Sequence, residues 1–176
     1  MYLVLSASLN PTSRSRILAR DCQRRLETIG RQGVLIDLAD HPLPLCDGAT
    51  AYGDPKVAEL GEQLDAADAV FIATPVYNFD VNAALKNAVE LTGKKWTGKV
   101  VAMMLAAGGS GSYMSAMPFA NSLMLDFRCV IVPRFVYTTG ESFEGESLAD
   151  EDIEARMELL VNETLTLSDA LAANAS

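Results

Sequence analysis

Short apolar runs alternate along the chain with segments whose apolar residues recur at helical spacing. Each run has the length and composition of a buried strand, and the runs cover residues 2–7, 34–38, 69–73, 99–106 and 129–137. Between them, helices are expected to begin at Ser13 and Asp54 and to cover residues 82–92, 112–127 and 152–172. Ser13 and Asp54 are typical N-cap residues, and Pro55 suits the first helical position.

Strands and helices alternate throughout, which predicts an α/β domain with a doubly wound parallel sheet and helices on both faces. We expect the strand order 2-1-3-4-5, which suits a five-stranded sheet with a nucleotide-type site. A chain of 176 residues has the size of one domain, and no repeat, low-complexity segment or linker divides it. Residues 1–176 are therefore expected to form a single domain.

The charge balance is acidic, with 14 Lys and Arg against 23 Asp and Glu and a net charge of −9. Binding to nucleic acid or to an anionic membrane needs basic surface, so neither partner is expected. No apolar run approaches the roughly 20 residues of a membrane-spanning helix. The N-terminal segment has no basic region ahead of its apolar run, and a cytoplasmic protein is expected.

The cysteines are Cys22, Cys46 and Cys129, and they are far apart with no C-x-x-C spacing. His41 is the single histidine of the sequence. Neither a disulfide framework nor a metal site is expected from this set, and each cysteine is interpreted as a small buried apolar residue.

Three polar or glycine-rich segments follow expected strands at their carboxyl ends. They are residues 8–15 after the first strand, 74–80 after the third and 107–113 after the fourth. With the order 2-1-3-4-5 these strands are neighbours, so the three loops would line one crevice, where open α/β sheets bind ligands.

The first loop is rich in hydroxyl groups and ends at a helix N-terminus, which predicts a phosphate site. Its hydroxyl residues, counting the end of the strand, are Ser6, Ser8, Thr12, Ser13 and Ser15. Arg14 and Arg16 could add positive charge. The alternative is a Ser/Thr-rich turn with one helix cap. No G-K-[ST] sequence occurs, so the loop is not a Walker A motif.

The other two loops are suited to a flat ligand. Tyr77, Asn78 and Phe79 could pack on a heterocycle and bond to its edge, although the aromatic rings could instead fill the core. The glycines of residues 108–112 allow close backbone approach, unless they only form a flexible turn. Together the three loops favour a phosphate-bearing planar cofactor. No side chain stands out as a general base, so we expect the cofactor to carry the chemistry and assign no catalytic residue.

At these loops the chain resembles the NAD(P)H-dependent FMN reductases of flavodoxin-like fold, a family that includes chromate and quinone reductases. The family's first loop has the form G-S-L-R-x-x-S-x-N, which the chain matches at Ser8, Leu9 and Ser13. The second has the form P-E-Y-N-x-S-x-P-G-x-L-K-N, which the chain matches at Pro75, Tyr77, Asn78, Leu85, Lys86 and Asn87. The glycine-rich turn after the fourth strand corresponds as well.

The resemblance implies that the first loop binds the FMN phosphate and that the other two hold the isoalloxazine ring. The implied phosphate contacts are Ser8, Asn10, Ser13 and Ser15, with Arg14 as a further candidate. The implied ring contacts are Pro75, Val76, Tyr77, Asn78 and Phe79 on one side, and Gly108, Gly109, Ser110 and Gly111 on the other. Hydride transfer is implied from NADPH or NADH through FMN to a small-molecule acceptor, such as free flavin, a quinone or a metal oxyanion. A homodimer or homotetramer is also implied.

Some positions depart from the family pattern. Asn10 stands in place of an arginine, which leaves Arg14 or Arg16 as the cation near the phosphate. The second motif departs at Val76, Asp80, Asn82 and Ala83. A flavodoxin-type electron carrier without turnover of its own is the alternative function, although the first loop lacks the T-x-T-G-x-T form of flavodoxins. A flavin-free interaction module is a third possibility.

Overall fold

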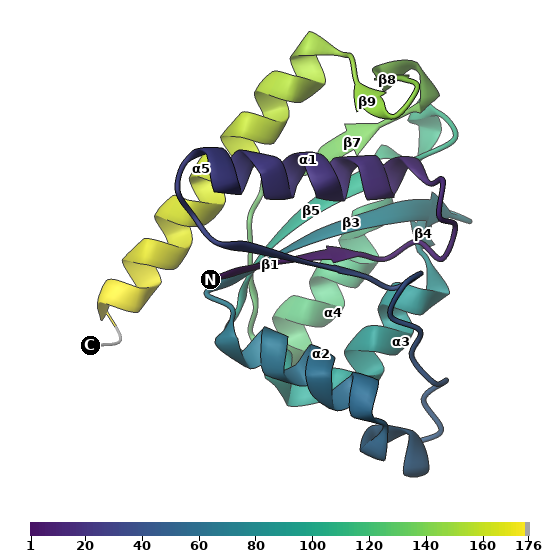
Figure 1. Cartoon of the computed structure of the whole chain (residues 1–176), viewed down its shortest axis with the longest axis vertical. Helices are drawn as coiled ribbons and strands as arrows, with labels where there is room; N and C mark the ends of the chain where they lie inside the picture. The colour runs from purple at the N-terminus through teal and green to yellow at the C-terminus, as the bar shows by residue number, and fades with distance from the viewer. Residues whose placement is uncertain (175–176) are drawn as a thin grey trace.

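The computed structural model describes residues 1–174, and it contains one central sheet with helices on both faces (Figure 1). The strand order is β2-β1-β3-β5-β6, all in parallel pairs, with β7 also pairing with β5. The strands of this sheet are β1 (Tyr2–Ser6), β2 (Gly33–Asp37), β3 (Ala69–Tyr77), β4 (Asp80–Val81), β5 (Val100–Ala106), β6 (Val130–Ile131) and β7 (Val136–Thr138). The predicted order 2-1-3-4-5 is confirmed, with β5 as the fourth strand and β6 and β7 together as the fifth.

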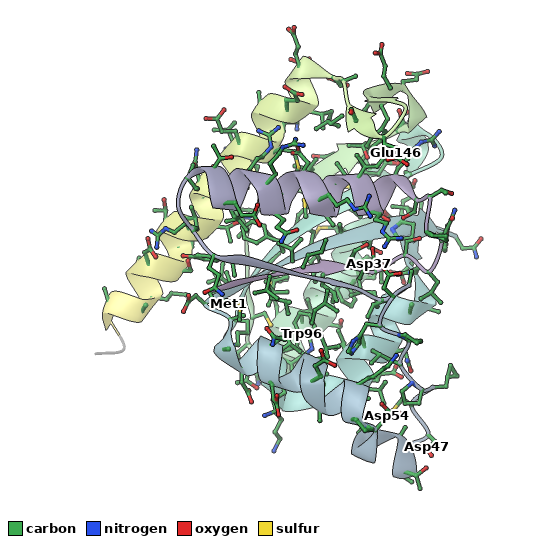
Figure 2. The ribbon with its side chains drawn as sticks, in the orientation of Figure 1. Met1, Asp37, Asp47, Asp54, Trp96 and Glu146 are labelled. Atoms are coloured by element: carbon green, nitrogen blue, oxygen red, sulfur yellow. The ribbon has the colours of Figure 1, made fainter. Side chains whose placement is uncertain are left out.

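Two apolar cores lie on opposite faces of the sheet because alternate strand residues point to opposite sides. Helices α1 (Arg14–Thr28) and α5 (Glu151–Asn174) cover one face, and α2 (Pro55–Ala66), α3 (Ala83–Thr92) and α4 (Met117–Phe127) cover the other. Trp96, labelled in Figure 2, is fully buried on the α2–α4 side, and its ring N–H donates to the Thr92 hydroxyl at 2.8 Å.

Short elements connect these layers. They are the 3₁₀ helices η1 (Thr50–Gly53), η2 (Gly93–Trp96), η3 (Ser110–Ala116) and η4 (Gly140–Ser142), and the hairpin strands β8 (Phe143–Glu144) and β9 (Ser147–Leu148). Of the helices in residues 1–174, none is both long and apolar enough to cross a membrane.

The expected helix starts at Ser13 and Asp54 are confirmed, since both side chains accept a hydrogen bond from a first-turn amide. The fifth strand was predicted as one run over residues 129–137, and this is wrong. Pro133 lies between β6 and β7 and has no N–H to donate to a strand ladder. The helix expected from residue 112 also begins later, because η3 precedes α4.

Residues 74–80 were predicted as a loop, and most of them are instead a β-hairpin. Strand β3 continues through Pro75 to Tyr77 and turns back into β4. Proline is tolerated here because β1 ends at Ser6, opposite Ala73, and β4 pairs with β3 only from Val76 onward, so at Pro75 β3 pairs with β5 alone. The hairpin carries the second motif out beyond the sheet, beside the site.

Candidate functional site

The carboxyl ends of β1, β3 and β5 surround a cavity of about 340 Å³. It is lined by Asn10, Thr12, Ser13, Arg14, Ser15, Pro75, Val76, Tyr77, Ala106, Ala107 and Gly108. We call it the cofactor cavity, because the sequence predicts a cofactor between these loops. Because the three strands are neighbours in the sheet, segments about 100 residues apart in the sequence meet at one edge.

Hydroxyl groups around the start of α1 line the end of the cofactor cavity where the sequence predicted a phosphate, which we call the phosphate end. The Ser13 hydroxyl accepts from the Arg16 amide at 3.3 Å and lies 3.2 Å from the Ser15 hydroxyl. Ser8 is buried beneath the loop, where its hydroxyl accepts from the Asn10 amide at 3.2 Å. The first amides of a helix have no acceptors within the helix, so this arrangement can hold an anion.

Asn10 lines the cavity and also shapes the turn. Its side-chain oxygen accepts from the Thr12 amide at 3.1 Å and from the Thr12 hydroxyl at 3.0 Å. Thr12 was noted among the hydroxyls of the loop but not as a site residue. The two hydrogen bonds from Thr12 to the Asn10 side chain fix Thr12 in the turn, where it lines the cavity.

Of the two arginines proposed from the sequence, Arg14 is the one at the cofactor cavity. Arg16 is already engaged, with its Nε 2.8 Å from the Asp37 carboxylate and a second ion pair to Asp40. Arg14 has no ion-pair partner among residues 1–174. Its guanidinium packs on Gly140, where an added Cβ would lie 2.8 Å from Nη2. A free cation thus stands beside the hydroxyl groups.

The β3–β4 hairpin and the turn after β5 form the end of the cofactor cavity where the sequence predicted a planar ring, which we call the ring end. Asn78 and Phe79 form the two-residue turn, and both have positive φ angles, 50° and 65°. Tyr77 and Phe79 are each 54% exposed. Asn78 faces a second cavity of about 520 Å³ between the hairpin and α4, and Tyr77 lines both cavities.

Asn82 fastens the hairpin to the sheet. It is buried, and its side-chain amide donates to the Ala7 carbonyl at 2.6 Å. Its side-chain oxygen accepts from the Thr74 hydroxyl at 3.2 Å and from the Leu85 amide at 3.4 Å, which caps α3. One side chain therefore joins the ends of β1 and β3 to the start of α3, a role that its place in the motif did not reveal.

The glycine-rich turn contributes less to the wall than expected. Gly108 lines the cofactor cavity, whereas Gly109, Ser110 and Gly111 are exposed and are not among its lining residues. Tyr137 holds the turn, since its hydroxyl donates to the Gly109 carbonyl at 2.5 Å and lies 2.8 Å from the Ser112 hydroxyl. Tyr137 lies in β7, outside the three loops predicted to form the site, so no local motif points to it.

The sequence-predicted residues therefore divide into two groups. The cavity brings together Asn10, Ser13, Arg14, Ser15, Pro75, Val76, Tyr77 and Gly108. The residues that lie beside it and are not on its wall are Ser8, Asn78, Phe79, Gly109, Ser110 and Gly111. Ala106 and Ala107 are on the wall but were not predicted as site residues. Ala106 was predicted as the end of the fourth strand, and Ala107 as the first residue of the loop after it.

The cysteines lie away from the cofactor cavity. Cys22 and Cys129 are buried, and burial raises the pKa of the Cys129 thiol to about 11 and that of Cys22 well above its usual value. Cys46 is only half-buried, unlike the expectation, and its sulfur lies 3.6 Å from the Tyr52 hydroxyl. The cavity wall has no Cys, His, Asp or Glu, so within residues 1–174 it offers no nucleophilic thiol or acid–base pair.

A family model described as NADPH-dependent FMN reductase matches residues 2–144, which include every wall of the cofactor cavity. The chain belongs to this family. It is accordingly an oxidoreductase of flavodoxin-like fold that works with FMN and a nicotinamide nucleotide.

Relatives of the FMN reductase chain extend over most of its length. It is 30% identical to an NADPH:quinone oxidoreductase of Arabidopsis thaliana over 87% of this chain and 84% of the relative. It is 26% identical to an NADPH azoreductase of Bacillus sp. (strain OY1-2), over 85% of this chain and 82% of the relative. Its fold is similar to that of FerB, a flavoenzyme NAD(P)H:(acceptor) oxidoreductase from Paracoccus denitrificans, with a TM-score of 0.79, 22% identity, and coverage of 96% and 97%.

Proposed function

We propose that this FMN reductase passes electrons from NADPH or NADH, through FMN in the cofactor cavity, to a small-molecule acceptor such as a quinone, free flavin or a metal oxyanion. One observation carries the proposal: hydroxyl groups at the N-terminus of α1 and the carboxyl ends of β3 and β5 line the same cavity. The first suits a phosphate, and the second suits the edge of a planar ring.

The phosphate end fits the phosphate of FMN by its chemistry. Ser13 and Ser15 present hydroxyls, the helix start presents amides, and Arg14 adds a cation with no competing carboxylate partner among residues 1–174. Charge-assisted hydrogen bonds of this kind are roughly twice as strong as neutral ones. Arg14 thereby stands in for the arginine that Asn10 replaces, as its position at the cavity supports.

The ring end fits the isoalloxazine through backbone and apolar groups. Pro75, Val76 and Tyr77 form one side, and Ala106 to Gly108 form the other. FMN bound there supplies the hydride and electron chemistry, which the side chains of the wall do not. The role of the protein is to bind the phosphate, orient the ring and leave one side open to the nucleotide and the acceptor.

We further propose that the protein forms a homodimer or homotetramer. Large apolar side chains are exposed on the hairpin, η3 and α4, namely Tyr77, Phe79, Tyr113, Met114 and Met117. Strand β4 contacts both η3 and α4, so these side chains belong to one region next to the cofactor cavity. Apolar patches of this kind commonly mark protein interfaces. Light scattering of Met117→Glu should show a smaller assembly than wild type.

The activity is tested by isolating the protein and following flavin absorbance and NADPH or NADH oxidation with a quinone or free FMN as acceptor. We expect a yellow protein, turnover without a separate reductase, and riboflavin binding about 100-fold weaker than FMN because it lacks the phosphate. Arg14→Ala should lower FMN affinity about tenfold and leave riboflavin affinity unchanged.

The matched control is Arg156→Ala on the exposed side of α5, which should change neither affinity. A colourless protein that does not bind added FMN would contradict the proposal. A protein that binds FMN but oxidises neither nucleotide would instead support the electron-carrier alternative.

A further inference from the structure

The second cavity at the ring end lies between the β3–β4 hairpin and α4, and we call it the hairpin cavity. Its volume is about 520 Å³, and it is lined by Tyr77, Asn78, Asp80, Val81, Asn82, Ala83, Lys86, Pro118, Phe119 and Ser122. Tyr77 also lines the cofactor cavity, so the two spaces share a wall. An acceptor that reaches a flavin ring beside Tyr77 is therefore close to the groups that line the hairpin cavity.

Asp80 places a carboxylate at this shared wall. It pairs with Tyr77 across the turn of the hairpin, and directly opposed residues of an antiparallel pair project to the same face of the ladder. Their Cβ atoms are then about 5 Å apart. Asp80 is exposed, its Oδ1 atom accepts from the Val81 amide at 2.7 Å, and it has no ion-pair partner among residues 1–174. Its negative charge is therefore available to whatever approaches Tyr77.

The basic side chain of the hairpin cavity does not cancel this charge. Lys86 lines the cavity, but its Nζ atom lies 3.5 Å from the Glu90 carboxylate, one turn further along α3. Asp80, Lys86 and Glu90 together carry one net negative charge. The whole chain, with its net charge of −9, acts in the same direction.

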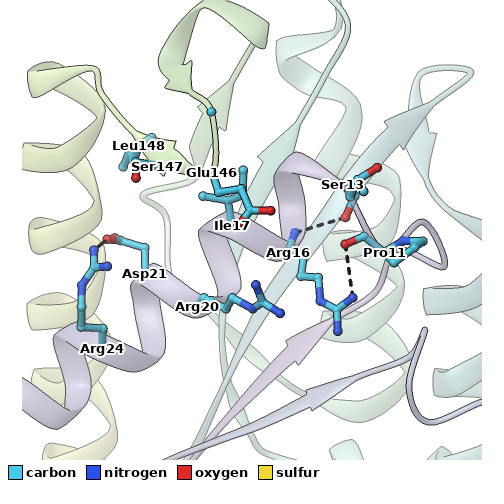
Figure 3. A pocket seen from close by; sticks show the side chains of 12 residues that line it. Pro11, Ser13, Arg16, Ile17, Arg20, Asp21, Arg24, Glu146, Ser147 and Leu148 are labelled. Atoms are coloured by element: carbon cyan, nitrogen blue, oxygen red, sulfur yellow. Dashed lines mark hydrogen bonds and ion pairs between the residues drawn. The ribbon is translucent and has the colours of Figure 1, made fainter.

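Positive side chains near the site are concentrated on α1, which begins at the phosphate end. Residues 14–24 of this helix include Arg14, Arg16, Arg20 and Arg24. The last three line a cavity of about 540 Å³ (Figure 3), where they outnumber the carboxylates of Asp21 and Glu146. The arginines thus lie along the helix that starts at the phosphate end, whereas the ring end presents a carboxylate.

We propose that Asp80 selects the electron acceptor by charge, so that the enzyme reduces neutral or cationic planar acceptors in preference to anionic ones of the same shape. An acceptor with a sulfonate, phosphate or oxyanion charge meets the carboxylate as it approaches the ring, and like charges at this separation repel. Among quinones, free FMN and metal oxyanions, this favours the uncharged quinones. The inference rests on the proposed function, because it needs an acceptor at a bound flavin.

The test compares reduction of 1,4-naphthoquinone and of its anionic 2-sulfonate by wild type, Asp80→Asn, Asp80→Ser and the control Glu158→Gln. Asparagine keeps an oxygen for the Val81 amide. Glu158 is exposed on α5, on the opposite face of the sheet, so its substitution changes the net charge equally. We expect both Asp80 variants to lower the KM for the sulfonate about fivefold, with kcat and the neutral quinone unchanged. Glu158→Gln should change nothing, and high salt should reduce the difference.

Redox-inert ligands give a readout that does not depend on turnover. Naphthalene-2-sulfonate and the neutral naphthalene-2-sulfonamide have nearly the same shape, and their binding to the FMN-loaded protein is followed by flavin absorbance. Asp80→Asn should bind the sulfonate about fivefold more tightly than wild type and the sulfonamide equally well. FMN affinity should be the same in all variants, which establishes that the hairpin is intact.

The outcomes separate this inference from the proposed function. Asp80 variants that treat both quinones as wild type does, or that reduce both faster by the same factor, would overturn the selection by charge while leaving the FMN site intact. An equal gain for the sulfonate in Glu158→Gln would also overturn it, because the charge of the whole chain would then set the preference. If the protein neither binds FMN nor reduces either quinone, the proposed function fails and this inference fails with it.

Discussion

The two ends of the cofactor cavity are built in different ways. At the phosphate end, the hydroxyls of Ser8, Ser13 and Ser15 contact neighbours within a few residues, and two of these side chains are buried. At the ring end, the hairpin extends beyond the sheet, and Tyr77 and Phe79 expose more than half of their surface, 54% each. The phosphate end is held by contacts between near neighbours in the sequence, whereas the ring end exposes apolar side chains to solvent.

This difference indicates that the two ends would contribute to binding in different ways. The hydroxyls of the proposed phosphate end are already arranged as an anion would need them, so binding a phosphate there would require little ordering. The ring end keeps two residues in the left-handed region at the tip of its turn and leaves aromatic side chains in solvent. Binding of the ring and association with a second copy can each cover that surface.

Asn82 links the two ends, so its removal should have the largest effect. Asn82→Ala leaves the Ala7 carbonyl without its donor and α3 without its cap, and we expect a loss of about 2 to 4 kcal/mol of unfolding free energy. Urea denaturation measures it. Asn121→Ala, on the exposed side of α4, should stay within about 0.5 kcal/mol of wild type. Equal stability of both variants would show that the ends are not coupled through Asn82.

At the phosphate end, two substitutions of Ser13 separate helix capping from ligand binding. Ser13→Asp keeps a good N-cap and should retain stability within about 0.5 kcal/mol, yet its charge should lower FMN affinity about 100-fold or more. Ser13→Ala should cost about 1 kcal/mol of stability and about tenfold in FMN affinity. Calorimetric titration and urea denaturation measure both. Undiminished FMN binding by Ser13→Asp would place the phosphate elsewhere.

At the ring end, relief of backbone strain should produce the smallest effect. Phe79→Gly should raise the unfolding free energy of the flavin-free protein by up to about 1 kcal/mol, because glycine adopts a positive φ readily. Asn78→Gly should gain less, since asparagine tolerates this region. Thermal unfolding at low protein concentration measures both. A loss of stability in Phe79→Gly would mean that its ring packs more strongly than its backbone is strained.

The features that the sequence predicted are those with a local or periodic signal. Ser13 at the start of α1 leads directly to the cap, and the alternation of apolar runs leads to the parallel sheet. The strand order has no such signal in the sequence and was expected from the nucleotide-type site. The hairpin was missed because Pro75 resembles a strand terminator, and only the early end of β1 makes it acceptable in β3. The position of Asp80 in β4 depends on that same extension.

Contacts between distant segments had no such signal. The bonds from Asn82 to Ala7 and from Tyr137 to Gly109 join residues 75 and 28 positions apart, and neither pair lies within one motif. The hairpin that closes a cavity over α1 comes from residues 145–148, and no local pattern in α1 points to it. Such sites appear only when the sheet has brought the segments together.

The packing of Arg14 on Gly140 has a consequence for how the protein matures. The cation at the phosphate end belongs to the first helix, while the surface on which it rests follows β7, near the end of the sheet. We expect the nascent chain to reach full affinity for FMN only after the last strand has docked. Flavin uptake during synthesis would then report completion of the fold rather than formation of the first motif.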